Sequence, residues 1–208
     1  MKVTYIQHCG SDLMVVNAAR VSFDKRNLVL DEERDPRIIR FLAKHGHTSP
    51  FNHTFITMHV KAPIYVARQL VKHKFMPWNE VSGRYVTFKP EFHMPTAFRS
   101  KAEDKKQGSG EPIVDDSNLR MLFKDQHYDS FLRYKAALDG GLCEEQARGL
   151  LPLDLMTQWY WSGTLGAWAD MYNLRAKPDA QEETREIAEQ AGEIIAPLFE
   201  HSWKALTQ

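Results

Sequence analysis

Cysteine is scarce in this 208-residue chain, which contains only Cys9 and Cys143. Two cysteines are too few for a disulfide framework or a thiolate metal cage. The chain also lacks net charge, because 27 basic residues balance 27 acidic ones, and this disfavours a protein that coats a polyanion or a membrane surface. An apolar run of about 18 residues, as a membrane span needs, is missing, and so is a secretion signal. We therefore expect a cytoplasmic protein with no nucleic-acid or membrane partner.

The hydrophobic patterns predict one domain, residues 1–208, of the α+β class, mostly helical with one antiparallel or mixed sheet. Strands are expected at residues 3–7 and 51–60. Helices are expected at residues 35–46, 63–71, 117–138, 144–151, 154–172 and 179–206. The charged segment 101–116, with few apolar residues, is predicted to be a surface loop within the domain.

The segment Lys72–Tyr85 combines cations, an amide, a carboxylate, a hydroxyl and a glycine. Its Ser82-Gly83-Arg84 turn offers a hydroxyl, an unhindered backbone N–H and a guanidinium, and these groups suit a phosphate. On the preceding helix, Gln69, Lys72 and His73 are three or four residues apart and converge at its C-terminal end. This pattern indicates a site for an anionic, aromatic small molecule. The alternative is a solvated basic turn.

Four histidines lie close together in the sequence and could in principle bind a metal ion: His45, His47, His53 and His59. Spacing argues against it, since His53 and His59 on one strand would lie about 20 Å apart at roughly 3.3 Å per residue. A cysteine nucleophile is also disfavoured, because two glutamates follow Cys143 and oppose thiolate formation. We expect neither a bound metal nor a catalytic cysteine.

Two arginines flanked by apolar residues, Arg148 and Arg175, are candidates for ligand binding. Such arginines usually lie along the surface, but they can also donate charge-assisted hydrogen bonds to a phosphate or a polar heterocycle. The aromatic run at residues 159–161 is more typical of a core than of a stacking platform. His47 and Ser49 lie in a loop where they can face a ligand, although a polar turn explains them equally well.

The whole set, in order, resembles the flavin-dependent thymidylate synthases. Their signature is Arg-His-Arg followed by seven residues and a serine, and that serine is Ser82 here. The match continues through residues 18–23, 44–47, 49–51, 60–63, 66–69, 79–80, 82–85, 151–153 and 173–176. It covers nearly everything except segment 101–116 and the C-terminal helix, which matches in character only.

The resemblance implies reductive methylation of dUMP to dTMP. Methylenetetrahydrofolate would supply the carbon, NADPH would reduce a bound FAD, and no enzyme cysteine would attack the uracil. A homotetramer with active sites between subunits is also implied. By the same resemblance Arg175, at the uracil ring, and His47, near the flavin and folate face, are the candidate catalytic residues. The implied dUMP-binding set is Gln69, Lys72, Glu80, Ser82, Gly83, Arg84, Arg148 and Arg175. The implied FAD-binding set is Ser49, Lys72, His73, Lys74 and Glu80.

The chain departs from the family pattern at three places, one of which is Pro77, where relatives often have a serine. Lys72 and Lys74 replace the signature arginines, which keeps the charge but loses the planar bidentate fork. Thr164, Gly166 and Asp170 stand where relatives place an Asn, an Arg and a later Asn toward the flavin, so no FAD contact is assigned to them. Two alternatives remain open: a nucleotide-binding relative without tight flavin binding, and a single-stranded nucleic-acid binder that uses the cations and aromatics of residues 72–85.

Overall fold

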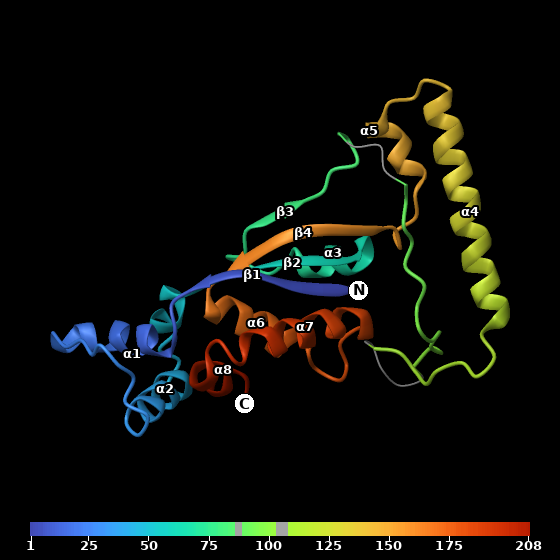
Figure 1. Cartoon of the computed structure of the whole chain (residues 1–208). Coiled ribbons are helices and arrows are strands. Elements are labelled where there is room, and N and C mark those ends of the chain that lie inside the picture. The colour runs from blue at the N-terminus through green and yellow to red at the C-terminus, as the bar shows by residue number, and fades with distance from the viewer. Residues whose placement is uncertain (86–88, 103–107) are drawn as a thin grey trace.

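A four-stranded antiparallel sheet, in the order β1-β2-β4-β3, organises the computed structural model of the chain (Figure 1). The structure describes residues 1–85, 89–102 and 108–208. The strands are β1 (Lys2–Cys9), β2 (Phe55–Pro63), β3 (Trp78–Glu80) and β4 (Met156–Gly163). The expected α+β class is confirmed, and the sheet is antiparallel.

One face of this sheet is buried and the other is open. In β2, Met58 and Val60 are fully buried and pair with Trp161 and Trp159 of β4. The intervening residue His59 pairs with Tyr160, which is half exposed. Because side chains alternate across a strand, the two central strands present an apolar face to the helices and a polar face outward.

Helices cover the buried face and continue beyond one end of the sheet (Figure 1). Helices α3 (Ile64–Leu70), α6 (Leu165–Arg175) and α7 (Glu182–Ile195) contact the strands. Helices α1 (Asp12–Arg20), α2 (Asp35–Lys44) and α8 (Glu200–Thr207) pack together at the end, with the short 3-10 helices η1 (Val21–Phe23) and η2 (Ser49–His53) nearby in the chain. The largest fully buried side chains of this core are Trp159, Trp161, Trp168, Phe51 and Phe199.

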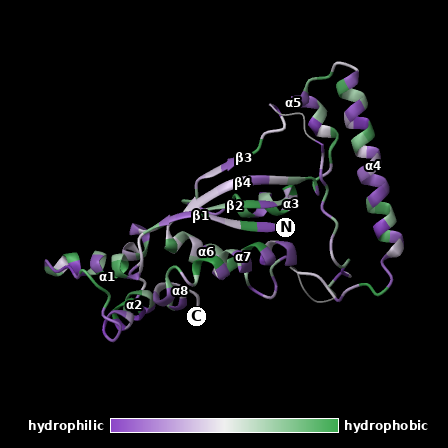
Figure 2. Ribbon diagram, viewed as in Figure 1, coloured by the Kyte–Doolittle hydropathy of each residue, from purple (hydrophilic) through white to green (hydrophobic). Residues whose placement is uncertain are grey.

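An arm formed by α4 (Ser117–Asp139), α5 (Glu144–Ala147) and η3 (Arg148–Leu150) stands to one side of the sheet (Figure 1). Within α4 only Ser130 and Tyr134 are buried. Figure 2 shows hydrophobic and hydrophilic residues mixed along this helix. The sequence correctly predicted α4 and the following short helix. The sequence did not indicate that α4 would pack against so few other residues of the same chain.

Several predicted boundaries are wrong. The helix expected at 154–172 is a strand followed by a helix, because residues 156–163 alternate between buried and half-exposed positions. The strand expected at 51–60 begins only at Phe55, since residues 49–53 form η2. His53 therefore shares no strand face with His59. The helix expected at 179–206 is two helices, α7 and α8, with Pro197 between them.

Within the predicted loop at 101–116, residues 103–107 are not among those that the structure describes. Its described second half runs back along the residues before it: Ser100 N donates to Glu111 O at 2.9 Å and Ile113 N donates to Phe98 O at 2.8 Å. Arg99 ties this segment to α7 through an ion pair with Glu183 at 2.7 Å. Among the helices that the structure describes, none is long and apolar enough to cross a membrane.

Candidate active site

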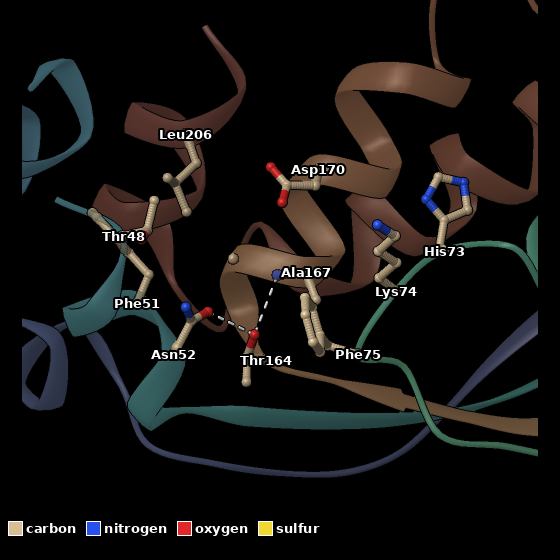
Figure 3. A pocket seen from close by; sticks show the side chains of 11 residues that line it. Thr48, Phe51, Asn52, His73, Lys74, Phe75, Thr164, Ala167, Asp170 and Leu206 are labelled. Carbon is tan, nitrogen blue, oxygen red and sulfur yellow. Dashed lines mark hydrogen bonds between the residues drawn. The ribbon is translucent and has the colours of Figure 1, made fainter. Parts of the chain in front are cut away.

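A cavity of about 630 Å³ opens between η2, the loop after α3, the first half of α6 and the end of α8 (Figure 3). Ligand pockets typically measure about 300–1,000 Å³. Phe51 and Phe75 give this cavity aromatic walls, while Lys74 and Asp170 contribute one charge of each sign. The residues that line it come from distant parts of the sequence, so the fold, and not a single motif, creates it.

Phe75 is held in an unusual backbone conformation at this cavity. Its φ angle is 61°, in the left-handed region that bulky residues rarely adopt, and its side chain is 88% exposed. Strain of this kind, of order 1–3 kcal/mol, tends to persist at ligand sites. The result is an aromatic face at the cavity that a planar ligand can contact.

Next to the cavity, Arg175 at the end of α6 binds one group in the last turn of α3 and one in the loop that follows it. Its Nε donates to His73 Nε2 at 3.0 Å, and its Nη2 donates to the carbonyl oxygen of Gln69 at 3.2 Å. Because a guanidinium has no acceptor, His73 Nε2 must be unprotonated. The structure therefore brings together three of the predicted site residues and fixes the tautomer of one.

Electrostatics agree with that geometry. Burial, together with the neighbouring Arg175 cation, lowers the pKa of His73 to about 4. Burial also lowers the pKa of Arg175, although a guanidinium stays charged in proteins. At neutral pH the pair is therefore a fixed cation beside a neutral imidazole, whose Nδ1 carries the proton. His73 also lines the cavity, so it lies between Arg175 and any ligand there.

The Gln69 side chain is engaged inside the protein. Its Oε1 accepts from Thr184 Oγ1 at 3.3 Å, and its Nε2 donates to Gln181 Oε1. Gln181 precedes the first residue of α7. The predicted contact of Gln69 with dUMP therefore requires its amide to leave these partners or to use its remaining donor.

Glu80 and the turn after it form a second group of predicted residues. The Glu80 carboxylate accepts from Thr157 Oγ1 at 2.7 Å and from Trp78 Nε1 at 3.1 Å. Ser82 Oγ accepts from Arg84 N and from Arg84 Nε, both at 3.3 Å. Ser82 is thus an acceptor within its own turn, and its hydroxyl proton remains available for a ligand.

The remaining predicted residues are exposed and belong to three separate segments of the chain, residues 47–49, Lys72 and Arg148. Arg148 is on the arm, where its Nε donates to the carbonyl oxygen of Glu145 at 3.2 Å. His47 packs against Phe41 with ring centroids 5.9 Å apart. Ser49 begins η2, and Lys72 makes no ion pair or hydrogen bond with another described residue. One chain therefore does not bring the whole predicted set together.

Four residues of the cavity wall were given no binding role from the sequence: Asn52, which the sequence did not single out, Phe75 within the segment Lys72–Tyr85, and Thr164 and Asp170, which were noted only as departures from the family pattern. Thr164 carried a usable signal, because a threonine before an apolar run is a helix N-cap. Its Oγ1 does accept from Ala167 N at 3.2 Å. The signal was lost because residues 154–172 were taken as one helix. No cluster of three or more potential metal ligands occurs in the described part of the chain.

The family model of the thymidylate synthase complementing proteins, Thy1, matches residues 4–199. The chain belongs to this family. A curated flavin-dependent thymidylate synthase of Thermus thermophilus is 38% identical over 206 residues, which cover 99% of this chain and 75% of the relative. Another from Thermotoga neapolitana is 37% identical over 186 residues, covering 89% and 81%. The resemblance seen in the sequence is confirmed.

Two solved structures of a UMP/dUMP methylase have the same fold. The UMP/dUMP methylase PolB from Streptomyces cacaoi, bound with 5-Br dUMP, superposes with a TM-score of 0.90 at 30% identity and covers 99% of this chain and 94% of its own. The same methylase bound with 5-Br UMP gives a TM-score of 0.86 at 29% identity, with 99% and 93% covered.

Proposed function

We propose that this Thy1 family member methylates dUMP to dTMP, with FAD as cofactor, methylenetetrahydrofolate as carbon donor and NADPH as reductant. The observation that carries the proposal is the contact between Arg175 and His73 at the edge of a ligand-sized cavity. The resemblance assigns one of these residues to the uracil and the other to the flavin. Their direct hydrogen bond supports a site where the two ligands meet.

The cavity suits a flavin in size and in wall chemistry. Phe75 offers an exposed aromatic surface to a planar ring, and Lys74 offers a cation. The Nδ1–H of His73 faces outward from its bond to Arg175 and can donate to a ring acceptor. When bound, FAD would supply the reducing equivalents of the reaction. Ser49, at the start of η2 beside the cavity, completes the proposed FAD contacts together with Lys72 and Glu80.

Arg175 would act on the uracil. Its Nη1 has no hydrogen-bond partner among the described residues, so it can face a substrate while Nε and Nη2 hold the side chain in place. A fixed cation at the uracil N3 and carbonyl side stabilises negative charge there and makes C5 a better nucleophile. No cysteine is needed for this step, and Cys9 and Cys143 are both exposed outside the cavity lining.

The phosphate of dUMP would bind at the Ser82-Gly83-Arg84 turn, assisted by Arg148. The Ser82 proton is free to be donated, and the two terminal nitrogens of Arg84 carry no bond to another described residue. Hydrogen bonds from a guanidinium to a phosphate are charge-assisted and strong. Glu80, fixed by Thr157 and Trp78, lies just before this turn and would bridge nucleotide and flavin.

We further propose a homotetramer in which neighbouring subunits complete each site. The arm supports this, because α4 exposes a set of large apolar side chains to solvent. These are Met121 at 58%, Leu122 at 63%, Tyr128 at 64% and Leu132 at 43% exposure. Exposed apolar surface of this extent is typical of an interface. Light scattering on the purified protein gives the mass that tests the assembly.

The decisive experiment is a visible absorption spectrum of the purified protein with FAD, recorded before and after adding dUMP. A flavin band that shifts with dUMP is the expected result, since both ligands would share one site. Nucleotide binding without flavin would instead identify a relative that has lost the cofactor. Oligonucleotide binding that weakens steeply with salt, in a protein that binds no flavin, would identify the nucleic-acid binder.

A second candidate substrate is UMP, because solved structures of the related methylase contain both 5-Br dUMP and 5-Br UMP. Competition between UMP and dUMP for the spectral shift, followed by product analysis, separates the two. Methylation of UMP at a rate near that of dUMP would extend the proposed reaction to the ribonucleotide.

A further inference from the structure

Gly166, in the first turn of α6, leaves the space that the Asn52 side chain occupies. A Cβ atom added at Gly166 would lie 2.6 Å from Asn52 Oδ1, closer than such atoms approach in real proteins. Any side chain at position 166 would therefore push the Asn52 amide out of its place. Asn52 comes from η2 and Gly166 from α6, so the absence of one side chain determines where the other sits.

Thr164 fixes the orientation of that amide. Its Oγ1 donates to Asn52 Oδ1 at 2.7 Å and accepts from Ala167 N at 3.2 Å (Figure 3). The helix N-terminus thus holds the hydroxyl, and the hydroxyl holds the amide oxygen. The Asn52 nitrogen then points away from Thr164 (Figure 3). It donates to no described residue, so two N–H donors of a cavity-lining side chain are available.

These donors add hydrogen-bonding capacity without adding charge. The other cavity groups that can donate are the Lys74 ammonium, the neutral His73 imidazole and the Thr48 hydroxyl. Asp170, one turn after Gly166 on the same face of α6, offers only acceptors while it is ionised. On the side of η2 nearest α6, the orientated amide of Asn52 is therefore a donor that has no partner among the residues that the structure describes.

We propose that Asn52 is a flavin-binding residue whose amide donates to a hydrogen-bond acceptor of the bound flavin, and that Gly166 and Thr164 position it. This inference rests on the proposed function, because it presumes that the cavity holds FAD. It assigns a cofactor contact to η2 and explains why a glycine stands in the first turn of α6. Gly166 and Thr164 act only through Asn52, so their effects on flavin binding must depend on it.

The test is a double-mutant cycle read out by the quenching of FAD fluorescence on binding to protein purified without flavin. Asn52→Ala should weaken FAD binding about fivefold, which corresponds to about 1 kcal/mol for one neutral hydrogen bond. Gly166→Ala should weaken it by a similar factor, because the new methyl displaces the amide. The double variant should be no weaker than either single variant, and Thr164→Ser should bind as the wild type does.

The matched controls are Asn118→Ala on the exposed side of α4 and Gly149→Ala, where an added Cβ meets nothing within 4 Å. Both should leave FAD affinity unchanged. The inference is overturned if Asn52→Ala binds FAD normally, or if the two losses multiply to about 25-fold in the double variant. If the wild-type protein binds no FAD, the proposed function itself fails, and that outcome is distinct from a normal affinity in the Asn52 variant alone.

Discussion

Replacing Arg175 with alanine is the sharpest test of the proposed chemistry. The change removes a cation that is held by donation to His73 at 3.0 Å and to the Gln69 carbonyl at 3.2 Å. It also removes Nη1, the group proposed to face the uracil. Loss of one donor aimed at developing charge typically costs about 100- to 1,000-fold in turnover, or about 2.7–4 kcal/mol. We expect dTMP formation by Arg175→Ala to fall by at least about 100-fold.

The assay is single-turnover dTMP formation with saturating FAD and dUMP, so that weaker binding does not imitate a chemical defect. The lost hydrogen bonds should destabilise the fold by about 1–3 kcal/mol, at about 0.5–1.5 kcal/mol each. Thermal melting must show that the variant is still folded at the assay temperature. Arg175→Lys keeps the charge but loses the fork, so its turnover should lie between the wild type and the alanine variant. Arg37→Ala, at an exposed position on α2, is the matched control.

A second readout of the same variant reports on geometry and not on activity. Burial first and the Arg175 cation second hold the pKa of His73 near 4. Without the cation, the His73 pKa measured by NMR titration should rise, while burial keeps it below 6.5. Near-normal dTMP formation by the folded variant would refute the catalytic role of Arg175. An unchanged His73 pKa would refute the contact between the two side chains.

Three further outcomes are expected. Arg84→Ala should weaken dUMP binding by about 1.5–3 kcal/mol, the range for a charged hydrogen bond, as measured by calorimetry. Stability measured by urea unfolding should fall as the pH drops from about 6.5 to about 4, because the unfolded chain protonates His73 in that window while its folded pKa stays near 4. Gly10→Ala should destabilise the fold by about 1–3 kcal/mol, because Gly10 has φ +90° and an added Cβ would lie 2.7 Å from Thr54 Cγ2.

The elements that the sequence predicted well are those with local signals. Helix α2 has Asp35 and Pro36 at its start, and α4 ends at Gly140, so capping chemistry located both. Strand β4 was not predicted, because its run of aromatic residues was interpreted as part of a helix. Its buried residues, Trp159 and Trp161, are two apart, which is the period of a strand. Bulky aromatics at neighbouring positions obscured that alternation.

The candidate site was predictable where it lies in a contiguous motif and not where the fold assembles it. Residues 69–84 were singled out from their own chemistry. The approach of Arg175 to His73 depends on where the fold places the end of α6 relative to the end of α3, and no local pattern encodes that contact. The same holds for Asn52 and Gly166, which come together only because η2 meets the start of α6. Glycine is unfavourable inside a helix, so the presence of Gly166 in α6 was the one local sign of a special role at that position.

The arm connects the proposed assembly to the proposed chemistry. Helix α4 has 23 residues, so it is about 35 Å long at about 1.5 Å per residue, yet it buries only Ser130 and Tyr134 within its own chain. Most helical stability in proteins comes from tertiary packing, and α4 has little of it in one subunit. Arg148, a proposed phosphate ligand, is carried by the same arm. If neighbouring copies cover α4, the association that stabilises the helix also places Arg148, so dissociation of subunits should cost folding stability and nucleotide binding together.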